Sequence, residues 1–166
     1  VRAWSIDRAG AGGPDGRVGP SRKIPAVGIR VARARDSGEL IIAGKEGIFL
    51  MHLDDPNSSA RLEGSHASPK IAISPDGLWI AVGAWQRNGV RVLDARKKGV
   101  VTELPGYSPY FAFSPCRRWL LVGTGREYRF WRVGDWQESG EKIEREAART
   151  AGCSMAFSPD GAILAI

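Results

Sequence analysis

The residues Ser74-Pro75-Asp76-Gly77 form a turn motif that recurs along the chain. The motif returns as Ser158-Pro159-Asp160-Gly161, and Ser114-Pro115-Cys116-Arg117 is a degenerate copy between them. Copies separated by 40 and 44 residues are typical of stacked supersecondary units. The sequence therefore favours a repeat protein over an enzyme with one unique site.

The residue types of the motif predict a tight hairpin corner. Proline presets φ at the second position, aspartate bonds to the local backbone, and glycine accepts a positive φ as the chain reverses. In the degenerate copy Cys116 and Arg117 replace the aspartate and the glycine. We therefore expect a longer or differently bent corner at 114–117.

Alignment on the motif extends the repeat toward the N-terminus. Arg35-Asp36-Ser37-Gly38 is a further copy that lacks the proline, with Gly38 aligned to Gly77. The apolar run Leu40–Ala43 then aligns with Trp79–Val82 as a second strand. Each unit consists of short strands separated by turn signals, which predicts an all-β class.

Two further strands complete each unit. A second reversal is predicted at Asn88-Gly89 in one repeat and at Glu46-Gly47 in another. The predicted third strands are Ile48–Met51, Val90–Asp94 and Tyr128–Trp131. Residues 1–4 fit the third-strand position of an earlier, partial repeat. Weaker fourth strands are predicted at Val100–Leu104, around Ala60–Leu62, and at Lys142–Glu144. Four strands in about 40 residues are typical of one blade of a β-propeller.

These features resemble the WD-repeat propeller family, in the form found in divergent bacterial arrays. Ala156-Phe157-Ser158-Pro159-Asp160-Gly161 is similar to the first hairpin of that family, and Leu93-Asp94 and Trp131-Arg132 match its third-strand Trp-Asp ending in part. Its Gly-His dipeptide survives only as Gly64-Ser65-His66, so the family's His, Ser, Asp and Trp hydrogen-bond network does not carry over. The resemblance implies a scaffold that binds proteins, often attached to signalling proteins such as serine/threonine kinases.

The expected architecture is a β-propeller of four-stranded antiparallel blades, about three complete and two partial. We expect a partial blade at 1–24, complete blades at 25–66, 67–106 and 107–150, and the first two strands of another at 151–166. This pattern predicts a segment of a longer propeller, whose open blade edges could self-associate. In the alternative, the two partial blades combine and close a four-bladed ring.

Composition excludes several classes of partner. The chain has 166 residues, a net charge of +6 and no apolar run long enough for a bilayer, so we expect no membrane partner. The charge is spread along the sequence without a nucleic-acid reader motif, so no specific nucleic acid is expected. The two cysteines, Cys116 and Cys153, lack metal or disulfide spacing, which favours a reducing, cytoplasmic setting.

No catalytic constellation is visible in the sequence. His52 and His66 have no spacing suited to a metal or a triad, and we interpret both as structural. Cys116 is a candidate reactive thiol beside Arg117 and Arg118, although a degenerate turn residue is the simpler interpretation. We expect no metal, no cofactor and no enzymatic activity in these residues. The alternative is an enzyme or cofactor-binding propeller whose central-channel site is contributed by other blades.

The predicted functional surface is a rim of aromatic and basic side chains. In a propeller, turns between second and third strands emerge on the same rim as links entering a first strand. The residues predicted to bind a protein or peptide partner there are Lys45, Trp85, Arg87, Tyr107, Tyr110 and Arg126. On the opposite rim, Arg96-Lys97-Lys98 and Arg117-Arg118 are predicted to converge with Trp136 on a second, weaker surface.

Overall fold

The computed structural model describes residues 2–7, 17–23, 30–55, 59–63, 69–84, 88–107, 110–124, 126–144 and 155–166. For the strands within 2–23, and for Glu63, Pro69, Ala84, Asn88 and Tyr107 in their strands, the description covers the backbone alone. All regular structure in these ranges is β-strand. They contain no helix of the length and hydropathy needed to cross a bilayer.

The strands form three four-stranded antiparallel sheets and two hairpins. The first sheet contains β3 (Arg30–Arg33), β4 (Glu39–Gly44), β5 (Gly47–His52) and β6 (Ala60–Glu63). The second contains β7 (Pro69–Ile73), β8 (Trp79–Ala84), β9 (Asn88–Asp94) and β10 (Gly99–Tyr107). The third contains β11 (Tyr110–Phe113), β12 (Trp119–Gly123), β13 (Glu127–Arg132) and β14 (Glu138–Glu144). The hairpins are β1 (Arg2–Asp7) with β2 (Arg17–Lys23), and β15 (Ala156–Phe157) with β16 (Leu164–Ala165).

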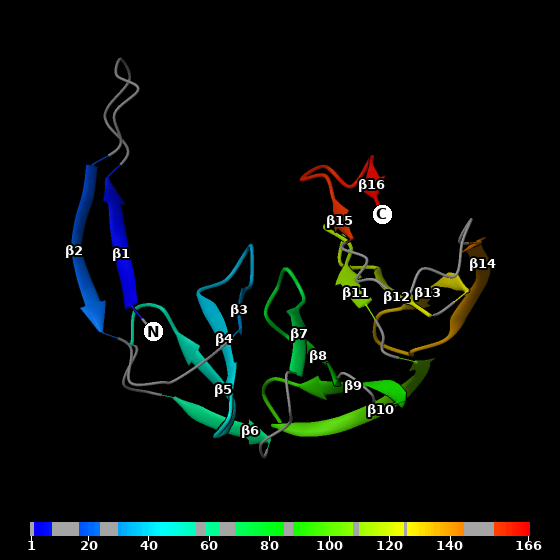
Figure 1. Cartoon of the computed structure of the whole chain (residues 1–166), viewed down its shortest axis with the longest axis horizontal. Coiled ribbons are helices and arrows are strands. Elements are labelled where there is room, and N and C mark those ends of the chain that lie inside the picture. Colours follow the sequence, from blue (N-terminus) through cyan, green and yellow to red (C-terminus); the bar gives the residue numbers. More distant parts are fainter. Residues whose placement is uncertain are drawn as a thin grey trace.

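Successive sheets follow one another around an arc, as Figure 1 shows. The first strand of each four-stranded sheet lies on the inside of the arc and the last strand on the outside. Strands paired in sequence order, in sheets that pack side by side, are the blades of a β-propeller. The predicted fold class is therefore confirmed, with three complete and two partial blades.

The two partial blades do not combine. In the described residues β1 pairs with β2 and β15 pairs with β16, as two separate two-stranded sheets. A four-bladed closure would require strands from the two hairpins to pair with each other. The structure contains no such composite blade in its described part.

Apolar side chains fill the space between neighbouring blades. Side chains alternate between the two faces of a strand, so one strand contributes to two interfaces. In β8, Ile80 and Val82 pack with Ile41 on the preceding blade, whereas Ala81 packs toward Leu120 on the following blade. Ile41, Ile80, Ala81 and Leu120 are fully buried. Each complete blade therefore depends on its neighbours for part of its core.

Hydrogen bonds inside the motif explain why it repeats. The Ser74 hydroxyl donates to Asp76 Oδ1 at 2.6 Å and accepts from the Trp79 amide at 2.9 Å. The same Asp76 oxygen accepts from the Leu78 amide at 3.1 Å. Ser74 is only 1% exposed, so these bonds replace water for buried polar groups. Ser158 and Asp160 make the equivalent 2.5 Å bond.

The degenerate copy keeps the same corner, so the predicted longer or differently bent turn is wrong. The Arg117 amide donates to the Ser114 carbonyl at 3.0 Å, as the Gly77 amide does to Ser74 at 2.9 Å. Arg117 adopts a φ of 63°, close to the 76° of Gly77. Cys116 Sγ lies 3.2 Å from Ser114 Oγ, in the place of the aspartate oxygen. Interactions elsewhere in the turn therefore hold an arginine in a conformation that favours glycine.

The sequence alignment of the first turn is wrong by one residue. The Ala34 amide donates to the carbonyl of Glu39, which is the bond that Ser74 makes with Trp79. Ala34 is therefore the equivalent of Ser74, and the strand positions of β4 match those of β8 at a spacing of 40 residues. A one-residue slip matters because it moves every side chain to the opposite face.

Gly38 was aligned wrongly with Gly77 because the two positions require glycine for different reasons. A Cβ at Gly38 would lie 2.3 Å from Nε2 of His52, so the residue lets the imidazole ring approach the backbone. Gly77, in contrast, has a φ of 76° and also lies against the preceding blade, where a Cβ would be 2.5 Å from Ser37 Oγ. The two glycines do not occupy equivalent positions.

The second reversals also differ from the prediction. Asn88 and Gly89 lie inside β9, so this dipeptide does not form the turn itself. In the first complete blade, Gly44 pairs with Gly47 around a two-residue turn at Lys45 and Glu46, one residue earlier than predicted. The pairing of β9 with β10 also shifts register near Asn88, so β9 is irregular where the turn was predicted.

Trp136 is a core residue, which corrects its predicted place on a surface. Its side chain is buried between blades, and its ring meets Trp79 edge to face at a centroid distance of 5.2 Å. Its backbone has a φ of 57°, and its amide donates to the Arg132 carbonyl. The turn after β13 therefore directs an aromatic ring back into the interface.

Exchange of Cys116 and Asp76 between equivalent turns tests the role of the motif. We expect Cys116→Asp to stabilise the fold by about 1 kcal/mol, because a carboxylate accepts charge-assisted hydrogen bonds from the Ser114 hydroxyl. We expect Asp76→Cys to destabilise it by a similar amount. Urea unfolding monitored by tryptophan fluorescence measures both. A destabilising Cys116→Asp would contradict the equivalence of the two turns.

Truncation of Trp136 tests its assignment to the core. We expect Trp136→Ala to lower the free energy of unfolding by about 3–5 kcal/mol, the range for loss of a large buried aromatic side chain. The exposed neighbour Gln137 provides the control, and Gln137→Ala should change stability by less than about 0.5 kcal/mol. Equal effects of the two substitutions would place Trp136 outside the core.

Candidate interaction surface

One rim of the arc combines the turns between second and third strands with the starts of the first strands. Because neighbouring strands are antiparallel, these segments lie at the same end of every blade. We call this surface the hairpin rim. Its members with described side chains are Arg30, Lys45, Glu46, Lys70, Tyr110, Thr124 and Arg126.

Arg30, Lys70 and Tyr110 hold the same position in three successive blades. Each of them pairs with the equivalent residue on the second strand of its own blade, and the equivalent positions in successive blades are 40 residues apart. First strands lie on the inside of the arc, so the three residues lie nearest the axis of the propeller (Figure 1). Blade geometry therefore brings together residues that are far apart in sequence.

A cation–π contact joins two of these positions across a blade interface. The Lys70 ammonium nitrogen lies 3.1 Å from the centroid of the Tyr110 ring. An ammonium group over an aromatic face is attracted by the quadrupole of the ring. Tyr110, predicted to bind a partner, is half-buried and already contacts the preceding blade. The contact also holds a positive charge at the inner edge of the hairpin rim.

Lys45 and Arg126 lie in equivalent turns and are exposed. Lys45 is in the two-residue turn between β4 and β5. Arg126 precedes β13, and its amide lies 3.4 Å from Thr124 Oγ1, which also accepts from the Glu127 amide at 3.2 Å. Within the described residues, neither Lys45 nor Arg126 has a side-chain ion pair. Both side chains are exposed to solvent.

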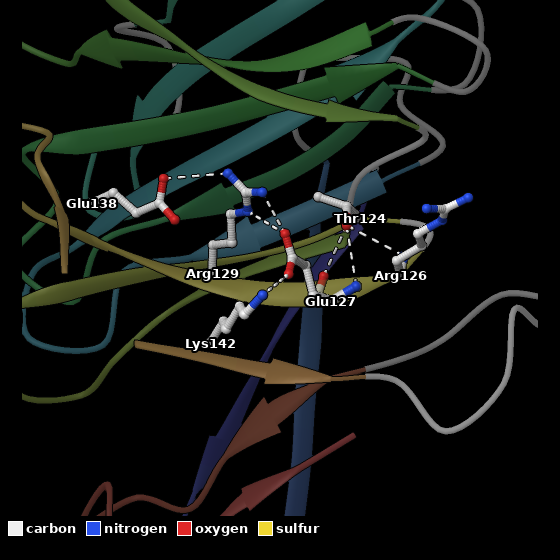
Figure 2. A network of polar contacts seen from close by, with 6 residues as sticks. All are labelled: Thr124, Arg126, Glu127, Arg129, Glu138 and Lys142. Atoms are coloured by element: carbon white, nitrogen blue, oxygen red, sulfur yellow. Dashed lines mark hydrogen bonds and ion pairs between the residues drawn. The ribbon is translucent and has the colours of Figure 1, made fainter. Parts of the chain in front are cut away.

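Glu127 is the centre of an ion-pair network below the Arg126 turn. Figure 2 shows its carboxylate between the side chains of Arg129 and Lys142. Arg129 donates through Nε at 2.7 Å and also through Nη2 to the same oxygen, and Lys142 Nζ lies 3.2 Å from the other oxygen. Arg129 extends the network to Glu138 at 3.3 Å.

The network keeps Glu127 ionised and offsets its charge. Hydrogen bonds from Arg129 and Lys142 lower the pKa of Glu127, and the bond to Glu127 raises the pKa of Arg129. Two carboxylates face two cations in this network, so it contributes no net charge to the rim above. Among the rim residues with described side chains, Arg30, Lys45 and Arg126 are exposed cations, Glu46 is an exposed carboxylate, and the ammonium of Lys70 is buried.

The opposite rim is formed by the repeated first turns, and here polar groups of different blades bond directly. Arg117 donates to Asp36 Oδ2 through Nη2 at 2.8 Å, across two blade positions. The Asp36 amide donates to the Pro75 carbonyl at 2.8 Å, and Arg35 donates to the Pro159 carbonyl of the last hairpin. The motif turns are therefore joined to one another, and they are structural.

The described residues contain no cluster of three His, Cys, Asp or Glu side chains suited to a metal ion. His52 interacts locally, since the Asp54 amide lies 3.3 Å from its Nδ1. Burial acts to raise the pKa of Cys116, but hydrogen bonds from Ser114 and Arg118 lower it overall. This thiol is exposed and its pKa is lowered, yet it lies in a structural turn.

The predicted site residues have different outcomes. Lys45 and Arg126 are exposed on the hairpin rim, and Tyr110 faces Lys70. Trp85 and Arg87 lie outside the described residues, and only the backbone of Tyr107 is described, in β10. The sequence analysis missed Arg30, Lys70 and the Glu127 network. A correct alignment of the first strands would have placed Arg30 and Lys70 with Tyr110.

Comparison with solved structures supports the propeller class. The sequence matches no protein-family model and no curated protein. Hydrazine synthase from Kuenenia stuttgartiensis has a TM-score of 0.64 and 18% identity over 81% of this chain. The dihydro-heme d1 dehydrogenase NirN has a TM-score of 0.59 and 20% identity over 84% of this chain. Hsv2 from Kluyveromyces lactis has a TM-score of 0.51 and 16% identity over 69% of this chain.

These similarities concern the fold. The chain spans 40% of the hydrazine synthase chain, 32% of NirN and 36% of Hsv2, with identities too low to carry over any activity. Together with the blade topology, they define the chain as a β-propeller.

The pH dependence of stability tests the Glu127 network. Its pKa is lowered in the folded state, so its stabilising contribution is present above the ordinary value of about 4.5 and is lost as pH falls through the folded value. We therefore expect Glu127→Gln to destabilise the protein at neutral pH and to differ little from wild type at the acidic end. Urea unfolding midpoints between about pH 3 and pH 7 measure this.

Glu141 on the same outer strand β14 provides a control. It is exposed, and Glu141→Gln removes the same charge without removing a partner of Arg129. If Glu141→Gln reproduced the pH-dependent loss, the effect would come from overall charge, and the network assignment would be wrong.

Proposed function

We propose that this chain is a noncatalytic interaction module, a propeller of WD-repeat type that presents its hairpin rim to a protein or peptide. The observation that carries the proposal is the contrast between the motif turns and the turns of the hairpin rim. Polar groups of the motif turns bond to other blades, whereas Lys45 and Arg126 occupy equivalent turns and are exposed. Side chains that a scaffold holds in place without using them for its own packing are suited to recognition.

The WD-repeat assignment rests on the sequence. Its support is the Ala-Phe-Ser-Pro-Asp-Gly hairpin at 156–161 and the hydrogen bonds of the equivalent turn at Ser74 and Asp76. A place in a larger signalling protein, such as a serine/threonine kinase, is a proposal from the same resemblance. Self-association through exposed blade edges is a further proposal, and light scattering over a range of protein concentrations tests it.

Selection of peptides from a random display library tests the function. We expect the immobilised chain to enrich a family of related peptides, and the double variant Lys45→Ala with Arg126→Ala to weaken their binding at least about tenfold. The variant Arg96→Ala with Lys97→Ala alters the turn between β9 and β10 on the opposite rim and should bind normally. Urea unfolding of both variants verifies that they fold.

Two outcomes would reject this function. Enrichment of no related peptides would remove the support for a peptide-binding rim, and equal losses in the two variants would remove the assignment to the hairpin rim. The enzyme or cofactor alternative, with a central-channel site contributed by blades outside this segment, predicts a bound group that metal analysis and the absorbance spectrum of the intact protein would detect.

A further inference from the structure

We propose that the first motif turn is a salt-sensitive clasp, which holds the motif turns of three later blades together and keeps the last hairpin ordered. The clasp consists of Arg35 and Asp36 with the groups that they bind, which are the carbonyls of Pro75 and Pro159 and the guanidinium of Arg117. It lies on the rim opposite the hairpin rim, and it is independent of the proposed peptide binding.

The first motif turn contacts the turns of three later blades. The Asp36 amide donates to the Pro75 carbonyl of the second complete blade at 2.8 Å. The Asp36 carboxylate accepts from Arg117 of the third, at 2.8 Å from Nη2 and 3.2 Å from Nε. Arg35 donates to the Pro159 carbonyl of the last hairpin, and its Nε lies 3.8 Å from Asp36. This turn is therefore a common point of attachment for three other turns.

The large apolar clusters connect neighbouring blades only. One of them joins the first and second complete blades, for example through Ile41 and Ile80, and the other joins the second and third through Val92 and Leu120. Asp36 and Arg117, in contrast, are 81 positions apart and belong to the first and third complete blades. The clasp therefore couples blades that neither of these clusters links.

Arg117 occupies a glycine position of the motif, with a φ of 63°. This conformation is unfavourable for a residue with a side chain, and it persists where surrounding interactions hold it. The two hydrogen bonds to Asp36 are interactions of this kind. The Asp36 and Arg117 side chains are 33% and 54% exposed, so dissolved salt screens the attraction between them. The contact between the first and third complete blades should therefore depend on ionic strength.

Much of the last hairpin is exposed, so single polar contacts matter more to its order. Its strands β15 and β16 have two residues each, and Ile163 and Ile166 are 67% and 50% exposed. The bond from Arg35 to the Pro159 carbonyl connects this hairpin to a turn 124 positions earlier in the sequence. Segments that bury little apolar surface open locally at low free-energy cost, and such a bond opposes that opening.

Amide hydrogen exchange of the full chain, resolved by residue with NMR, tests the clasp. The reporters are the Ser158 and Ile163 amides, which are hydrogen-bonded within the last hairpin. We expect Arg35→Ala to accelerate their exchange at least about threefold, because the hairpin opens more often without the bond to Pro159. The control Arg33→Ala removes the same charge from an exposed residue of β3, and it should change these rates by less than about 1.5-fold.

The substitution Arg117→Gly separates coupling between blades from damage to the turn itself. Glycine accepts the positive φ, so the turn should be kept and the Ser114 amide should exchange as slowly as in wild type. The ion pair is lost, so we expect exchange of the Asp36 amide, two blades away, to accelerate at least about threefold. Urea unfolding of each variant verifies the fold.

Salt tests the clasp without any substitution. Raising sodium chloride from about 50 to 500 mM should accelerate exchange of the Asp36 amide in wild type at least about twofold, because salt screens the charges that hold this turn. The Ser74 amide, which donates to the Trp79 carbonyl, is the internal reference and should change by less than about 1.5-fold.

Three results would overturn the inference. These are equal effects of Arg35→Ala and Arg33→Ala on the last hairpin, an unchanged exchange rate at Asp36 in Arg117→Gly, and exchange of the Asp36 amide that does not depend on salt. Peptide selection on the hairpin rim measures the proposed function separately, so either proposal can fail while the other stands.

Discussion

A backbone hydrogen bond closes each of the four described motif turns, from the amide at the Ser74 position to the carbonyl five residues later, and the rest of this structure depends on it. In the second complete blade, Ser74 bonds to both Asp76 and the Trp79 amide, which fixes where the second strand starts. That start determines which side chains face each neighbouring blade. Arg117 shows how strongly the turn is specified, since a non-glycine residue accepts a positive φ to preserve it.

The same turns connect the blades to one another. The Asp36 amide bonds to the Pro75 carbonyl, and Arg117 reaches Asp36 across the intervening blade. Apolar packing between sheets provides most of the burial, and Trp136 contributes to it from a connection that sequence reasoning assigned to the surface. The rim of the motif turns is thus used for assembly, whereas Lys45 and Arg126 on the hairpin rim are exposed and make no side-chain ion pair in the described part of the chain.

Ion pairs occur toward both rims. On the rim of the motif turns, Arg117 pairs with Asp36, and below the hairpin rim Glu127 is paired by Arg129 and Lys142. Exposed cations without a side-chain ion pair also occur on both rims of the described part of the chain, for example Lys45 on the hairpin rim and Lys97 on the other. Exposed charge alone therefore does not distinguish the two rims.

The sequence by itself determined the repeat, the all-β class and most strand positions, because turn chemistry and alternation are local properties of the chain. It failed where one residue type serves two purposes. Gly38 resembles a turn glycine but gives room to His52, and Trp136 lies in a connection but packs against Trp79. The contact between Lys70 and Tyr110 was decided by tertiary structure, because residues 40 positions apart become neighbours only when separate sheets pack face to face.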